Sequence, residues 1–312
     1  MPPELPVISS PNNPDLSVSM GKFSLKNPVV AASGTFGYGL EFTPFVDLNQ
    51  LGGFCTKGLS LEPRLGNPVP RVAESGEGML NAIGLENVGL EKFAAEKLPR
   101  IAQYSCAVIC NFFGNTVEEY VRMAEALSAH ERVDALEMNI SCPNVKEGGH
   151  QFSSDPRLVE EVVGAARKAA AKFLIVKLSP NVTDITETAR AAEAAGADAL
   201  SLTNTHVGMV MDIETRAPYL ANITGGLSGP AIKPISLQMV YHTARAVKVP
   251  LFGVGGIRTA EDALEYLMAG ARAVQVGTAN FFDPGVTLKI VQGMKTWCRD
   301  NGVRSISELY PL

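Results

Sequence analysis

Eight short apolar runs recur along this chain, and each is followed by Gly, Asn, Ser or Thr and then by a helical pattern. The residues within a run are almost continuously apolar rather than alternating, which is typical of strands buried on both faces of a parallel sheet. The predicted strands are residues 28–32, 53–57, 107–112, 135–140, 173–178, 199–203, 251–254 and 273–276. Few folds accommodate eight buried strands that alternate with helices.

Helical patterns fill the segments between the predicted strands. Thr116 begins one with a capping box, Thr-Val-Glu-Glu, and Asp155 with Pro156 begins another that runs toward Lys172. Further helices are predicted for residues 184–195, 230–247, 260–269 and 284–301. No Pro/Ser-rich linker divides the sequence. This alternation over roughly 250 residues predicts an α/β fold, a (β/α)8 TIM barrel in which residues 1–312 form a single domain, with a doubly wound sheet as the alternative.

The composition excludes several classes of protein. With 46% hydrophobic and 19% charged residues among 312, the chain can bury a large core, which excludes global disorder. The net charge of −5 leaves no basic footprint for nucleic acid. No apolar run approaches the ~18 residues that cross a bilayer, and the first residues have no signal-peptide pattern. We therefore expect a cytoplasmic protein that binds neither membrane nor nucleic acid.

The five cysteines form no even, clustered framework, so reduced thiols are expected rather than disulfides. Cys106 and Cys110 lie four residues apart, but on a strand their Cα atoms would be roughly 13 Å apart, too far to share one ion. No spacing in the sequence resembles a structural zinc site or an iron–sulfur site. The sequence therefore predicts no metal on this chain.

The polar ends of the predicted strands are the first candidates for a site, because the active site of such a barrel lies at the carboxyl ends of its strands. Nearly every predicted strand ends in groups that can hydrogen-bond or carry charge. Lys57 and Lys177 end otherwise apolar strands, and burying an ammonium is costly without a partner. Both lysines are therefore candidate functional residues.

Glycine-rich segments near the last two strands predict a phosphate site. They are Gly226-Leu227-Ser228-Gly229, Gly253-Val254-Gly255-Gly256 and Gly277-Thr278. Glycine lets the backbone approach a ligand closely, and barrels often hold a phosphate in the loops after strands seven and eight. Any one segment alone could be only a tight turn. Neither a P-loop nor a Rossmann fingerprint is present.

Cys142 differs from the other cysteines because it lies in a polar loop just past a strand end. Asn139, Asn144 and Lys177 are the polar groups expected near it, and a cationic neighbour lowers the pKa of a thiol. A thiolate held within reach of a C–H group can act as a general base, and an inert loop cysteine is the alternative. No nucleophile elbow or metalloprotease motif competes with it.

Six motifs in order along the chain carry a resemblance to a known family. They are N-A-I-G-L-E-N (81–87), N-I-S-C-P-N (139–144), V-K-L-S-P-N (176–181), N-T (204–205), G-G-L-S-G-P (225–230) and G-T-A-N-F (277–281). Together they resemble the dihydroorotate dehydrogenases, specifically the class 1B catalytic subunits, which hold FMN. The resemblance implies oxidation of (S)-dihydroorotate to orotate in pyrimidine (UMP) biosynthesis, with hydride passing to FMN and Cys142 as the base.

The resemblance also implies roles for individual residues. Positions that match flavin contacts are Ser33, Lys57, Gly58, Asn111, Asn139, Lys177 and Thr203, and those that match the phosphate cradle are Gly229, Gly255, Gly256, Gly277 and Thr278. Positions that match substrate contacts are Lys57, Asn81, Ala82, Ile83, Gly84, Leu85, Asn139, Asn204 and Thr205. A lysine ammonium beside the flavin would stabilise the negative charge that arrives with hydride. Asparagine amides can satisfy both the donors and the acceptors of a uracil-like ring.

Class 1B catalytic subunits pass electrons to a second subunit that carries FAD and a [2Fe–2S] cluster and reduces NAD⁺. The resemblance therefore implies a homodimer joined by such electron-transfer subunits in a heterotetramer. The alternatives are a class 1A-like, fumarate-reducing dehydrogenase, an FMN barrel acting on another dihydropyrimidine, a cofactor-free lyase that uses Lys177 as a Schiff base, and a barrel kept only as a binding subunit. His150 and His206 are the histidines nearest the expected site, and His206 stands where an apolar residue is expected.

Overall fold

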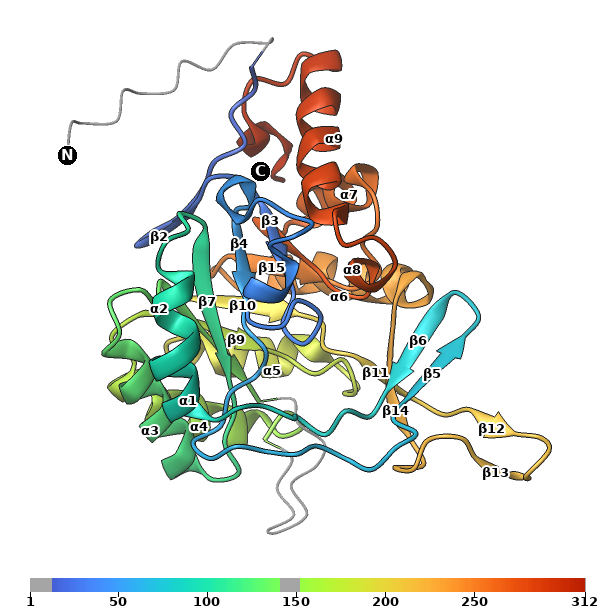
Figure 1. Ribbon diagram of the computed structural model, residues 1–312. Helices are drawn as coiled ribbons and strands as arrows, with labels where there is room; N and C mark the ends of the chain where they lie inside the picture. The colour runs from blue at the N-terminus through green and yellow to red at the C-terminus, as the bar shows by residue number, and fades with distance from the viewer. Residues whose placement is uncertain (1–12, 141–151, 312) are drawn as a thin grey trace.

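In the computed structural model, which describes residues 13–140 and 152–311, the chain forms a closed barrel of parallel strands (Figure 1). The barrel strands are β3 (Val29–Ala31), β4 (Gly53–Cys55), β7 (Ala107–Phe112), β8 (Ala135–Asn139), β9 (Phe173–Lys177), β10 (Ala199–Leu202), β15 (Leu251–Val254) and β16 (Ala273–Val276). They follow one another around the ring in chain order, and β16 pairs with β3 to close it. The eight predicted strands and the (β/α)8 barrel are confirmed.

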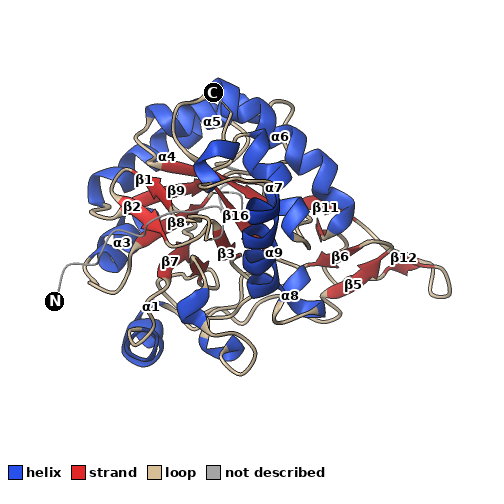
Figure 2. Ribbon diagram, turned by 90° about the horizontal axis from the view of Figure 1, so that it is seen from above, coloured by secondary structure: helices blue, strands red, loops and turns tan. Residues whose placement is uncertain are grey.

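Helices pack around this ring and bury the outer faces of the strands. The helices are α1 (Leu90–Lys92), a π-helical turn (Phe93–Lys97), α2 (Leu98–Ile101), α3 (Val117–Ser128), α4 (Pro156–Ala169), α5 (Ile185–Ala194), α6 (Lys233–Ala246), α7 (Ala260–Ala269), α8 (Ala279–Phe282) and α9 (Val286–Asp300), with short 3-10 turns at Leu40–Phe42, Leu48–Gln50, Pro230–Ile232 and Ile306–Leu309. Figure 2 shows α3, α4, α5, α6 and α7 in an arc around the strands. Along the described part of the chain, no helix combines the length and apolarity needed to span a membrane.

The predicted helices form with boundaries that move by a few residues, and one cap differs. The Thr116 hydroxyl accepts the N–H of Glu119 (3.2 Å), as a capping box requires. The Glu119 carboxylate, however, accepts the N–H of Asn115 (2.7 Å), one residue before the cap, so the box is not reciprocal. The helix predicted from residue 230 begins as a 3-10 turn and becomes α-helical at Lys233.

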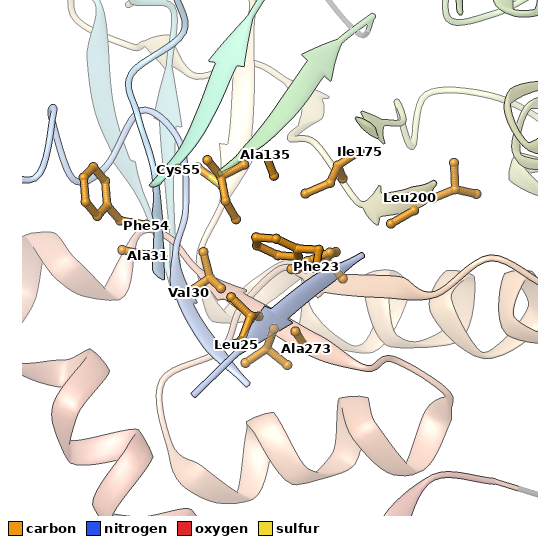
Figure 3. Close-up of a cluster of buried hydrophobic side chains, with 14 of the residues drawn as sticks. Phe23, Leu25, Val30, Ala31, Phe54, Cys55, Ala135, Ile175, Leu200 and Ala273 are labelled. Carbon is orange, nitrogen blue, oxygen red and sulfur yellow. The ribbon is translucent and has the colours of Figure 1, made fainter. Parts of the chain in front are cut away.

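A hairpin that the sequence reading did not predict lies across the amino-terminal end of the barrel. Its strands are β1 (Val18–Met20) and β2 (Phe23–Leu25), paired antiparallel. Phe23 stacks on Phe173, the first residue of β9, with ring centroids 5.1 Å apart. Figure 3 shows Phe23 and Leu25 beside Val30 and Ala273 of the barrel interior. The hairpin therefore plugs the end of the barrel opposite the strand termini that carry the polar residues.

A second sheet lies beside the carboxyl ends of the strands and was also not predicted. Its strands, in spatial order, are β11 (His206–Gly208), β14 (Gly225–Ser228), β6 (Gly78–Asn81) and β5 (Val72–Ser75), and a small ribbon of β12 (Met211–Asp212) and β13 (Ala217–Pro218) extends from it (Figure 1). The sheet joins the loop after β4 to the loop after β10. Four buried side chains, Ala73, Leu80, Ala82 and Leu220, form its own small core, separate from that of the barrel.

Candidate active site

A cavity of about 1110 Å³ opens at the carboxyl ends of the barrel strands, with the four-stranded sheet as one wall. Every described residue that the sequence assigned to flavin or substrate lines this cavity. These residues are Ser33, Lys57, Gly58, Asn81, Ala82, Ile83, Gly84, Leu85, Asn111, Asn139, Lys177, Thr203, Asn204, Thr205, Gly229, Gly255, Gly256, Gly277 and Thr278. Cys142 and His150 lie outside the described residues.

The two candidate lysines meet different environments. Lys57 follows β4, where its backbone N–H donates to the carbonyl of Gly37 (2.8 Å), and its side chain is partly buried. Within residues 13–140 and 152–311 its ammonium makes no ion pair. Lys177 ends β9 and is buried, with its Nζ 3.8 Å from the Glu137 carboxylate. Lys177 therefore has an ion-pair partner, whereas the Lys57 ammonium has none among the described residues and can interact with a ligand in the cavity.

Glu137 and Gln275 are polar residues inside the barrel that sequence reasoning missed. Glu137 is fully buried on β8; its Oε1 accepts from Asn111 Nδ2 (2.7 Å), and its Oε2 accepts from Gln275 Nε2. Burying a carboxylate is tolerable only with such donors and a nearby cation. A single Glu within A-L-E-M-N and a single Gln within A-V-Q-V were the available signals.

Asparagine amides form another part of the cavity wall. Asn204 Nδ2 donates to Asn139 Oδ1 (3.4 Å), and Asn204 Oδ1 accepts the N–H of Thr205 (2.8 Å). The backbone carbonyl of Asn139 accepts from the Tyr120 hydroxyl (2.8 Å). The bond between Asn204 and Asn139 links the ends of β8 and β10, and the Tyr120 bond links the end of β8 to α3, so the amides that line the cavity are held in a defined arrangement.

Residues 81–85, at and just after the end of β6, line the cavity, and hydrogen bonds from Asn67 hold them in place. Asn67 donates its N–H to the carbonyl of Ile83 and its Nδ2 to that of Ala82, both at 2.9 Å. Gly84 has φ +78°, and a Cβ there would lie 2.5 Å from Asn67 Cγ. The turn therefore requires glycine at this position.

Glycines from three loops form a further part of the cavity wall. Gly255 and Gly256 have φ of +136° and +68°, and a Cβ on Gly255 would lie 2.4 Å from Ser236 Oγ. Among the described residues, the N–H groups of Gly255, Gly256, Gly277 and Thr278 donate to no protein acceptor. Free N–H groups along a backbone with no side chains in the way form a cradle suited to an anion.

The remaining predicted positions frame this cradle. The Thr203 hydroxyl lies 2.9 Å from the Ser236 hydroxyl, and the Thr278 hydroxyl donates to Ser228 Oγ (2.7 Å). Asn111 Oδ1 is buried without a partner among the described residues. An acceptor left unpaired in a cavity wall is costly unless a bound ligand donates to it.

His206 lies on β11, partly buried, and burial lowers its pKa. Its Nε2 is buried and has no partner in the described part of the chain. The residue is absent from the cavity lining, so its position supports no direct role at the site.

Solved structures share this architecture. The crystal structure of DHODH from Eimeria tenella in complex with ferulenol superposes with a TM-score of 0.77 over 99% of this chain and 90% of that one. At 22% sequence identity, that likeness concerns the fold alone.

Curated relatives are much closer in sequence. The chain is 57% identical over 296 residues to the "Dihydroorotate dehydrogenase B (NAD(+)), catalytic subunit" of Pelobacter propionicus, covering 95% of this chain and 97% of that one. Proteins of the same name from Geobacter sulfurreducens and Bacteroides fragilis are 56% and 52% identical over the same shares. The family model for dihydroorotate dehydrogenase matches residues 15–297. The chain thus belongs to the dihydroorotate dehydrogenase family of oxidoreductases.

Proposed function

We propose that this chain oxidises dihydroorotate to orotate in pyrimidine biosynthesis as the catalytic subunit of a B-type, NAD⁺-linked enzyme. Relatives that carry this name match nearly the whole chain at 52–57% identity. Their name favours the B type over the fumarate-reducing alternative. Membership in a family of oxidoreductases argues against the lyase and binding-subunit alternatives. The observation that carries the proposal is that one cavity gathers residues of every described motif.

FMN is the flavin that we propose for this cavity, and two features of the cavity wall support it. The glycine cradle offers N–H donors for a phosphate, while Asn111 Oδ1 offers an unpaired acceptor for a ring N–H. Residues proposed to hold the cofactor are Ser33, Lys57, Gly58, Asn111, Asn139, Lys177, Thr203, Gly229, Gly255, Gly256, Gly277 and Thr278. When bound, FMN supplies the acceptor for hydride from C6 of the substrate.

The protein's own residues would bind the substrate and remove the proton. Asn81, Asn139 and Asn204 present amides that can pair with the donors and acceptors of a pyrimidine ring. Lys57 has no ion-pair partner in the described residues, so its ammonium is available to an anionic group in the cavity. Cys142, three residues after the end of β8 in the sequence and outside the described residues, is proposed as the base that takes the C5 proton. Ala82, Ile83, Gly84, Leu85 and Thr205 would complete the substrate contacts.

The name "catalytic subunit" implies further subunits. We propose that an electron-transfer subunit with FAD and a [2Fe–2S] cluster accepts electrons from this chain and reduces NAD⁺, in a heterotetramer built on a homodimer. The site draws on residues from Ala32 to Val286, which supports treating the chain as one domain. A cytoplasmic location is part of the proposal, and the four described cysteines are free buried thiols, as expected in a reducing compartment.

The test is anaerobic mixing of the FMN-loaded protein with dihydroorotate while flavin absorbance is followed. We expect bleaching by the native protein and almost none by Cys142→Ala, which still binds FMN. Flavin bleaching by Cys142→Ser should be slow near neutral pH and should speed up at high pH, because a hydroxyl loses its proton less readily than a thiol. Cys106→Ala is the matched control, since Cys106 is buried away from the cavity. Near-native bleaching by Cys142→Ala would contradict the assignment of the base.

A second measurement tests the partner. The isolated chain, once reduced by dihydroorotate, should transfer electrons to NAD⁺ only very slowly. Rapid NADH formation by the chain alone would contradict the requirement for a second subunit. Rapid reoxidation by fumarate would instead favour the fumarate-reducing alternative.

A further inference from the structure

A buried carboxylate lies directly behind a lysine of the cavity wall. Lys177 lines the cavity from the end of β9, whereas Glu137, on the neighbouring strand β8, does not reach the cavity surface. Their charged atoms are 3.8 Å apart, with side-chain exposures of 7% and 0%. An ammonium at the surface of the site is thus backed by a fixed negative charge.

This carboxylate has little freedom to move. Asn111 on β7 donates to one oxygen, and Gln275 on β16 donates to the other. Hydrogen bonds to an ionised acceptor are stronger than neutral ones. Because the donors belong to separate strands of a closed barrel, Glu137 is fixed by the frame of the fold rather than by a loop. Cys55 also contacts it, and burial together with the Glu137 charge raises the pKa of that thiol.

We propose that Glu137 is a positioning residue for Lys177. Its carboxylate fixes the Lys177 ammonium at the cavity wall and reduces the positive potential that this ammonium produces at the bound flavin. The inference rests on the proposed function, because the ammonium has this role only when FMN occupies the cavity. As a pair, the two side chains present almost no net charge to the site. Without the carboxylate, Lys177 would present one full positive charge in a medium where charges are weakly screened.

The charge balance has a measurable consequence. A reduced flavin carries more negative charge than an oxidised one, so a nearby positive charge favours the reduced form. Glu137→Gln, which keeps the shape and removes the charge, should therefore raise the midpoint potential of bound FMN. We expect the ratio of reduced to oxidised flavin at a given solution potential to rise at least tenfold, equal to about 30 mV for two electrons.

The experiment is a titration of the FMN-loaded variants against a reference dye, together with FMN binding by the apoproteins. Lys177→Gln should shift the potential in the opposite direction, to lower values. Glu137→Asp keeps the charge but withdraws it from the ammonium, so its shift should have the same sign as that of Glu137→Gln and be smaller. If Glu137→Gln fails to fold, Glu137→Asp decides. A potential equal to that of the native protein in the variants that fold would overturn the proposal.

Cys55→Ala is the matched control. Cys55 is buried against the same carboxylate, so the substitution disturbs packing without changing charge. It should leave the potential at the native value. A shift as large as that of Glu137→Gln would assign the effect to packing and overturn the proposal. A native protein that binds no FMN, or whose flavin is not bleached by dihydroorotate, would refute the proposed function itself. If the native protein binds FMN and is bleached, but the midpoint potential of Glu137→Gln equals the native value, only this inference is refuted.

Discussion

Replacing Gly256 by Ala tests whether the glycine cradle requires a bare backbone. Gly256 has φ +68°, and an L-residue in this left-handed region costs about 1–2 kcal/mol. An added Cβ would also lie 2.6 Å from the Cβ and 2.9 Å from the backbone nitrogen of Lys233, and 3.0 Å from the carbonyl oxygen of Gly229. Two of these three atoms are backbone, so the loop itself must move, and overpacking of this kind adds about 1–3 kcal/mol. The expected loss of unfolding free energy is therefore about 2–5 kcal/mol.

Gly302 provides a matched control for the backbone term. Its φ is +71°, and no heavy atom lies within 4 Å of an added Cβ. Gly302→Ala should therefore cost only about 1–2 kcal/mol. Urea unfolding of the two apoproteins measures the difference, which isolates the collision with Lys233 and Gly229.

The same variants give a second measurement in the binding of FMN. Displacement of the loop at Gly256 should weaken FMN binding at least tenfold, or about 1.4 kcal/mol, whereas Gly302→Ala should leave it unchanged. Quenching of FMN fluorescence on binding to the apoprotein gives the dissociation constants. Equal losses of stability in both variants, with native FMN affinity in Gly256→Ala, would refute the reasoning.

Two further predictions concern stability. Phe23→Ala should lower the unfolding free energy by about 3–5 kcal/mol, because it removes the buried ring that the hairpin packs against Phe173. Phe45→Ala, at an exposed position, should change the unfolding free energy by no more than about 0.5 kcal/mol. Equal urea midpoints for the two variants would contradict the role of the hairpin. Burial raises the pKa of Asp262, but hydrogen bonds from Lys233 and two backbone N–H groups outweigh it and hold that pKa below its usual value. The ionised Asp262 thus stabilises the fold above the unfolded pKa of about 3.9, and this contribution is lost as the pH falls through the lower folded pKa. Asp262→Asn should be about 1.5–3 kcal/mol less stable at pH 7. Urea unfolding at decreasing pH should show this difference begin to shrink below about pH 4 and go on shrinking as the pH falls through the lower folded pKa. A difference independent of pH would contradict the assignment.

The barrel could be predicted because its strands are buried on both faces. Burial on both faces leaves an unbroken apolar run such as F-L-I-V in residues 173–176, followed at once by a polar residue at the strand end. Both signals are local in sequence. The same locality made the polar residues at the barrel strand ends predictable as cavity lining, since the barrel brings all its strand ends to one side. Residues 81–85, which lie at and just after the end of a strand of the other sheet, were assigned only through the family resemblance.

The features that were missed depend on contacts between distant segments. The sheet of β5, β6, β11 and β14 pairs residues 72–81 with residues 206–228, and no local pattern specifies that partner. Glu137 and Gln275 each stand alone in an apolar strand, and their hydrogen bond joins residues 138 positions apart. A single polar residue in such a run signals a buried contact, but its partner cannot be identified before the ring is closed.

The separate small core of that sheet affects how this protein can change. Ala73, Leu80, Ala82 and Leu220 pack with one another and not with the interior of the barrel. Substitutions along this wall can therefore be compensated by its own neighbours, without repacking of the eight-stranded frame that holds Glu137 and Lys177. The part of the cavity that carries most of the proposed substrate contacts can therefore diverge among relatives at a different rate from the part that carries the proposed cofactor contacts. New ligand preferences would then arise first in residues 72–82 and 206–228.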